Sequence, residues 1–186
     1  MNTEQTDETQ AYTLTARLLH WCMAITVIGM FILGLWMVDL GYYDPWRKDA
    51  PEIHKSIGIL LFVLMAFRLF WRWFKGVPAP LSSHSKLERV GAHAAHMALY
   101  GLMFAIMISG YLISTADDRP ISVFGFFDVP ALGSLFANQE DIAGDIHLVL
   151  AISVIGVAAL HALAALKHHF VDKDQTLMRM IRISKP

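Results

Sequence analysis

The segment from Gly144 to His169, GDIHLVLAISVIGVAALHALAALKHH, is almost wholly apolar in its centre, yet it contains histidines at positions 147 and 161. Residues 146–166 include no Lys, Arg, Asp or Glu. Their number matches the roughly 20 apolar residues that a helix needs to cross a bilayer. An ionisable side chain is costly and rare inside a membrane-spanning helix, so these two imidazoles indicate a functional site.

Three further segments have a similar apolar character. Residues 14–38 contain one charge, Arg17, residues 90–116 contain none, and the apolar run 56–67 continues through Arg68 and Arg72 to Phe74. The chain of 186 residues is 55% hydrophobic and only 17% charged, which is too apolar for a soluble domain of this length. Lipid offers no partners to unpaired backbone groups. We therefore predict an all-α integral membrane bundle of four transmembrane helices in up-down-up-down order.

The predicted bundle occupies residues 14–170, between a polar tail at 1–13 and a C-terminal tail at 171–186. With four spans, both tails share a side with the connection between the second and third spans. Only four of the fifteen Lys and Arg residues lie on the opposite side, namely Arg47, Lys48, Lys55 and Arg119. The positive-inside rule therefore places both termini in the cytoplasm.

The two predicted outer connections carry a net charge of −6 with histidine neutral, a field that disfavours anionic partners. The longer of them, residues 115–145, contains ISVFGFFDVP, which we interpret either as a lid on the membrane surface or as a packed loop. The inner connection GVPAPLSSHSKLER, residues 76–89, is rich in Pro and Ser and is expected to end the helices on both sides.

The depth of the histidines in the bilayer follows from helix geometry. Fourteen residues make close to four helical turns and a rise of about 21 Å, so His147 and His161 share a face at the outer and inner levels. Antiparallel neighbours then bring His54 to the level of His147 and His20 to the level of His161. The outer pair has no competing histidine, whereas at the inner level His93 or His96 could replace His20.

Two stacked imidazole pairs are what a membrane protein with two haems requires. A b-type haem iron takes two axial imidazoles from facing helices. A ligating imidazole also needs an acceptor for its second ring nitrogen. Gly58, one turn after His54, would let a porphyrin approach the helix, or would only ease helix packing. His84, His168 and His169 are interpreted as interfacial or solvated side chains near the inner surface.

The order of these motifs resembles the bacterial cytochrome b561 family, which is related to the cytochrome b subunits of nickel-iron hydrogenases. The resemblance extends from about Tyr12 to Arg179 and is carried by four stretches: RLLHWCMA, APEIHKSIGILLFVLMAFRLFWR, AHAAHMALYGLMFAIMISGYLIS and IHLVLAISVIGVAALHALAALKHHFVDKDQTLMRM. It implies a multi-pass protein of the bacterial inner membrane with two b-type haems.

The resemblance also assigns roles to individual histidines. Its axial ligands fall on His20, His54, His147 and His161, which selects His20 for the inner pair. His93 and His96 match paired histidines of the third helix. The resemblance implies that they lie near the inner haem without ligating it, and that they take part in proton handling or in contact with a propionate.

The resemblance implies electron exchange with the quinone pool, with ubiquinone as a substrate, in a chain surrounded by membrane lipid. A periplasmic redox partner is compatible with this expectation, and no nucleic acid is expected. Some similar proteins oxidise superoxide, but the acidic outer loops disfavour an anion, although the four outer bases could form a positive funnel. Arg17, Arg68 and Arg72 are candidate contacts of a propionate or a quinone headgroup, or serve only to set the topology.

Two alternative functions remain at this point. The chain could be the haem-bearing membrane anchor of a larger dehydrogenase or hydrogenase. It could also be a haem-free transporter that uses its histidines as a relay for protons or metal ions.

Overall fold

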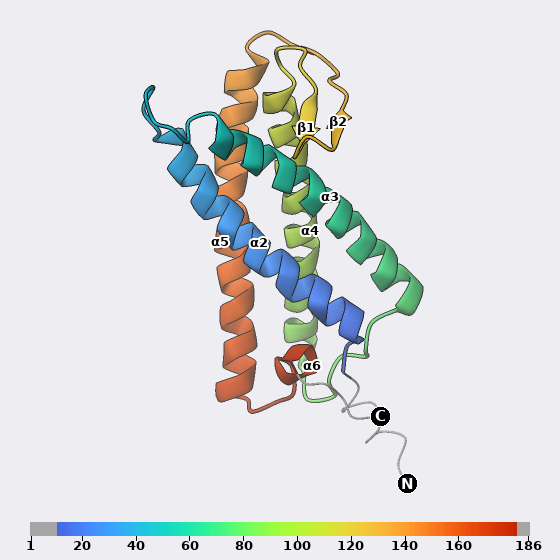
Figure 1. Ribbon diagram of the computed structural model, residues 1–186. Helices are drawn as coiled ribbons and strands as arrows, with labels where there is room; N and C mark the ends of the chain where they lie inside the picture. The colour runs from blue at the N-terminus through green and yellow to red at the C-terminus, as the bar shows by residue number, and fades with distance from the viewer. Residues whose placement is uncertain (1–10, 182–186) are drawn as a thin grey trace.

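The computed structural model describes residues 11–181, and four long helices form most of it (Figure 1). These are α2 (Leu14–Val38), α3 (Asp49–Lys75), α4 (Lys86–Ser114) and α5 (Gln139–Phe170). Two short strands, β1 (Ile121–Val123) and β2 (Phe127–Val129), and a short helix, α6 (Met178–Ile181), complete the described fold. Positions 1–10 of the predicted polar tail, and the bases Arg182 and Lys185, lie outside the described residues.

All four long helices are apolar enough and long enough to cross a membrane. Large apolar side chains remain exposed within the apolar run of each of them, for example Ile25 at 70%, Val63 at 58%, Ile108 at 56% and Val149 at 63%. A soluble monomer does not expose apolar side chains on this scale. These side chains form a lipid-facing belt, and the predicted four-span bundle is confirmed.

The bundle is arranged around two pairs of helices. In Figure 1, α4 and α5 run side by side, while α2 and α3 cross them obliquely. The core between them consists of Met23, Leu61, Met65, Met103 and Val154. Val154 is seven residues from both His147 and His161, about 10 Å along the helix in each direction. The apolar core thus lies between the two histidine levels.

The helix ends follow from local capping. The Thr13 hydroxyl accepts a hydrogen bond from Ala16 N at the start of α2. At the start of α4, the Ser85 hydroxyl accepts from Glu88 N, and Glu88 accepts from Ser85 N, which makes a capping box. The predicted turn segment 76–89 is therefore too long, because this box starts the helix at Lys86.

The longer outer connection contains a small antiparallel hairpin, an addition to the predicted all-α fold. Ile121 pairs with Val129 and Val123 with Phe127. Ile121 and Val123 are buried against α3, where the Ser56 hydroxyl donates to Ser122 O and accepts from Phe124 N. The strand β1 is therefore packed onto α3, and the predicted lid on the membrane surface remains a prediction.

At the inner end, the connection before α4 and the turn after α5 fold against each other. His84 and His168 are only 15% and 13% exposed here, so of the two predicted alternatives the solvated one is wrong for these residues, and the interfacial one remains a prediction. Both lie within 3.0 Å of the Asp174 carboxylate. Burial alone would raise the pKa of Asp174, but hydrogen bonds from Thr176 and His84 outweigh it and hold the pKa below its ordinary value of 3.8.

Candidate haem-binding site

The structure brings the four histidines together in two pairs. At the outer level, the ring centroids of His54 on α3 and His147 on α5 are 6.2 Å apart, with an interplanar angle of 70°. At the inner level, the centroids of His20 on α2 and His161 on α5 are 6.3 Å apart, at 75°. The near-equal separation and angle give the two levels the same local geometry.

The orientation of His147 is fixed by hydrogen bonds from α4. Its Nδ1 lies 3.0 Å from the Ile106 carbonyl oxygen and 3.0 Å from the Ser109 hydroxyl. Since a carbonyl can only accept, we assign the proton to Nδ1. This tautomer leaves the lone pair on Nε2, and an imidazole held by a backbone carbonyl in this way is typical of a metal ligand.

Two glycines make room beside the outer histidines. A Cβ added at Gly110 would lie 3.1 Å from His147 Cε1, and one added at Gly34 would lie 3.3 Å from His54 Cε1. Gly58 was suggested by the sequence as the position where a porphyrin could approach the helix, or as a position that eases helix packing. It faces Met30, whose Cε would be 3.8 Å from an added Cβ. Its role as a haem contact remains a prediction.

The inner level contains a third imidazole and a cation. His96 on α4 lies 5.1 Å from His161 between ring centroids, closer than His20 does. The Arg68 guanidinium donates to the Tyr100 hydroxyl at 3.3 Å. Its positive charge is close enough to interact electrostatically with the imidazoles of this level, namely His20, His96 and His161. His93 is exposed. Of the two third-helix histidines, His96 is therefore the one that belongs to this level.

A fourteen-residue spacing runs through all four long helices. It separates His147 from His161, and it also relates the pairs His20 and Gly34, His54 and Arg68, and His96 and Gly110. Gly34 and Gly110 therefore fall at the outer level, and Arg68 and His96 at the inner level, as the contacts above show. Neither glycine was predicted from the sequence, although the same spacing in the other three helices is a signal that indicates both.

Four of the remaining candidate bases have other partners among the described residues. Arg17 is buried and donates to the Ile181 carbonyl at 3.3 Å. On the outer side, Lys55 pairs with Glu52, Arg119 pairs with Asp117 at 3.1 Å, and Arg47 donates to the Leu40 carbonyl. Two of the four outer bases are therefore paired with carboxylates, which reduces the positive charge available for the predicted funnel.

The residues present at the outer level fit a haem. Imidazole nitrogens bind a metal ion at about 2.0–2.1 Å in protein zinc sites, so facing rings 6.2 Å apart leave room for one ion between them. The glycines keep the flanks of both rings free of side chains. His54 differs from His147 in that its Nδ1 is buried and has no hydrogen-bond partner within residues 11–181, so no acceptor fixes the tautomer of this ring.

A four-helix membrane bundle with a histidine pair at each of two levels defines a membrane cytochrome of the b type. Residues 11–182 match the family described as prokaryotic cytochrome b561, and the chain belongs to that family. Its place is accordingly the bacterial inner membrane, which it crosses several times, and its role is electron transfer by b-type haem.

Similar proteins cover nearly the whole chain. Cytochrome b561 homolog 2 of Escherichia coli (strain K12) is 54% identical over 176 residues, which is 95% of this chain and 94% of that protein. A protein of Yersinia pestis named "Probable superoxide oxidase CybB" is 33% identical over 88% of this chain and 91% of its own length. Cytochrome b561 homolog 1 of Escherichia coli (strain K12) is 28% identical over 88% and 92%.

Proposed function

We propose that the chain carries electrons across the inner membrane with two b-type haems and exchanges them with the quinone pool. The proposed axial pairs are His54 with His147 and His20 with His161. The observation that supports this assignment is the repetition of one geometry at both levels, with ring separations of 6.2 and 6.3 Å. The shorter distance between His96 and His161, 5.1 Å, favours His96 as a neighbour of the inner site.

The bound haem iron would supply reversible one-electron chemistry. The residues of the chain would orient the ligands and provide the charged, proton-binding and apolar groups around the haems. The Ile106 carbonyl and Ser109 orient His147 and raise its basicity. Arg68 offers a positive charge to a propionate or a quinone headgroup at the inner level, and His96 offers an imidazole that can bind or release a proton. The apolar core around Val154 excludes water between the levels.

The axial assignment is tested by single alanine substitutions. His54→Ala and His147→Ala are expected to remove one haem and leave the other, because each haem iron needs both of its imidazoles. His20→Ala and His161→Ala should remove the other haem. Haem per chain is measured from the pyridine haemochrome spectrum of the purified protein, and His169→Ala is the matched control. Full haem content in His54→Ala and His147→Ala would contradict the assignment.

Quinone exchange is tested separately on the intact protein. Ubiquinol should reduce the haems of the isolated chain in liposomes, as followed by visible absorption. The alternative, a membrane anchor of a larger dehydrogenase, predicts no reduction by quinol without the partner. The name of the Yersinia pestis relative attributes superoxide oxidation to that protein; in this chain, paired outer bases and acidic outer loops disfavour an anionic substrate.

A further inference from the structure

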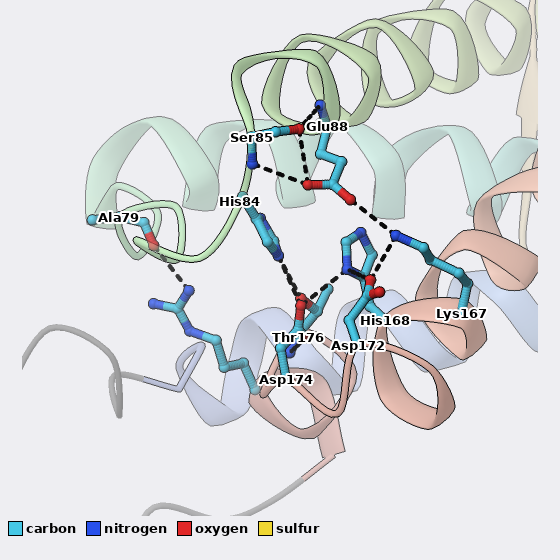
Figure 2. A network of polar contacts seen from close by, with 10 residues as sticks. Ala79, His84, Ser85, Glu88, Lys167, His168, Asp172, Asp174 and Thr176 are labelled. Atoms are coloured by element: carbon cyan, nitrogen blue, oxygen red, sulfur yellow. Dashed lines mark hydrogen bonds and ion pairs between the residues drawn. The ribbon is translucent and has the colours of Figure 1, made fainter.

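A second cluster of histidine and carboxylate side chains lies at the inner end of the bundle, apart from the proposed axial ligands (Figure 2). His84 comes from the connection between α3 and α4, His168 from the last turn of α5, and Asp174 from the turn that follows α5. In Figure 2 the three side chains point toward one another. Three segments distant in the sequence thus contribute to one polar site.

The three potential ligand atoms converge on a single point. His84 Nε2 lies 3.0 Å from Asp174 Oδ2, and His168 Nδ1 lies 2.9 Å from the same oxygen. The atoms all lie within 4.8 Å of one another. The side chains are only 15%, 13% and 10% exposed for His84, His168 and Asp174 respectively. This burial distinguishes the cluster from an ordinary set of surface charges.

The contacts of His168 are unusual for a buried imidazole. Its Nδ1 has carboxylate oxygens of both Asp172 and Asp174 at 2.9 Å, yet it makes no hydrogen bond with any residue between 11 and 181. The oxygens are close enough, but they lie outside the direction in which the ring N–H would point. A nitrogen that offers its lone pair to a metal ion has no need of that N–H.

The surroundings hold Asp174 in place for such a role. Thr176 N donates to Asp174 Oδ1 at 2.8 Å, and Asp174 N donates to the His168 carbonyl at 3.0 Å. The other oxygen, Oδ2, is therefore presented to the two imidazoles. On the flank, Lys167 Nζ pairs with Glu88 at 2.9 Å and with Asp172 at 2.7 Å, so the Asp172 Oδ2 atom is shared between Lys167 and His168.

We propose that His84, His168 and Asp174 bind one divalent transition-metal ion of the zinc type. Two imidazoles and one carboxylate form a donor set that zinc uses, with the fourth tetrahedral position left for water. The ion would draw the three donors around itself in place of their present direct contacts. It would join the connection before α4 to the C-terminal end of α5, and so lock the inner end of the bundle.

The test uses the full-length protein with its haem, freed of loosely held metal by a chelator. Zinc chloride is titrated by equilibrium dialysis, and bound zinc is measured by elemental analysis, which haem iron does not disturb. We expect one zinc ion per chain. His84→Ala removes a ligand and should weaken binding at least about tenfold, the loss that already follows in other metal sites when a residue that only orients a ligand is changed. His169→Ala, which changes the adjacent histidine outside the cluster, should bind zinc as the unmodified protein does.

Two further measurements keep the test decisive. Asp174→Asn preserves the shape of the side chain and should also weaken zinc binding. For each variant, an unchanged haem spectrum shows that the protein is folded. X-ray absorption at the zinc edge should show nitrogen and oxygen neighbours with imidazole scattering. Equal zinc binding by the unmodified protein and His84→Ala, or a zinc shell without imidazole, would overturn the proposal.

Discussion

Gly110 lies against the ring of His147, and we expect its replacement to disturb the outer site. A Cβ at this position would lie 3.1 Å from His147 Cε1, tighter than an ordinary contact. Overpacking of this kind typically costs about 1–3 kcal/mol. Gly110→Ala should therefore lower the thermal stability of the haem-loaded protein and reduce the occupancy of the outer haem, measured by visible absorption.

The same helix provides a matched control. Gly101 on α4 has no atom within 4 Å of an added Cβ among the described residues. In a helix interior, alanine is more stable than glycine by about 0.5–1 kcal/mol. Gly101→Ala should therefore keep or raise stability and leave both haems bound. Equal effects of the two substitutions would show that Gly110 has no special role.

Ser109 belongs to the same site and offers a subtler test. Its hydroxyl donates to the Ile106 carbonyl at 2.9 Å and lies 3.0 Å from His147 Nδ1. Ser109→Ala removes one acceptor from the imidazole N–H, so His147 becomes a weaker base. A less basic ligand stabilises the oxidised iron less, and the midpoint potential of the outer haem should rise. A redox titration that shows no shift in either haem would contradict this expectation.

Helical spacing and depth were enough to propose His54, His147 and His161 from the sequence, whereas His20 was chosen over His93 and His96 only by the family resemblance. The neighbours Gly34, Gly110 and Ser109 could not be predicted, since their contacts depend on how the helices are rotated against each other. Gly58 illustrates the same limit. It is one turn from His54, but that turn faces Met30 of α2.

The start of α4 depends on its capping box, and this dependence can be measured. Ser85→Ala removes the hydroxyl that accepts from Glu88 N, and loss of an N-cap typically costs about 1 kcal/mol. Glu88 also holds Lys167 of α5, so the substitution should loosen the contact between these helices. Thermal unfolding should show the loss, whereas Ser83→Ala, an exposed serine outside the helix, should have a smaller effect. A larger loss for Ser83→Ala would contradict the assignment of the cap.

The helices are longer than their apolar runs, for a physical reason. Residues 146–166 are free of charge, but α5 extends from Gln139 to Phe170. Acidic residues at its beginning and Lys167 at its end suit the helix dipole and lie where the helix leaves the lipid. Charge-free runs therefore predicted which segments cross the membrane but not where each helix ends. The hairpin escaped prediction because Ser56 of α3, distant in sequence, fixes it.

The bundle as a whole has a small buried core and exposes many large apolar side chains on its outer surface. Ile152 lies on α5 between the two histidine levels and is 57% exposed on the apolar belt. In transfer experiments, an arginine at the centre of a membrane helix costs about 2.5–3.5 kcal/mol. We therefore expect Ile152→Arg to lower the amount of folded protein in the membrane, measured as haem-containing protein in isolated membranes.

Val171, just beyond the end of α5, provides the comparison. It is 71% exposed, but it lies where α5 has already ended, near the inner bases. Val171→Arg should leave the amount of haem-containing protein unchanged, because an arginine at this depth meets water and lipid headgroups rather than acyl chains. If Ile152→Arg accumulated as well as Val171→Arg, the exposed face of α5 would not be in contact with the hydrocarbon core. The arrangement of the two histidine levels across the bilayer would then have to be revised.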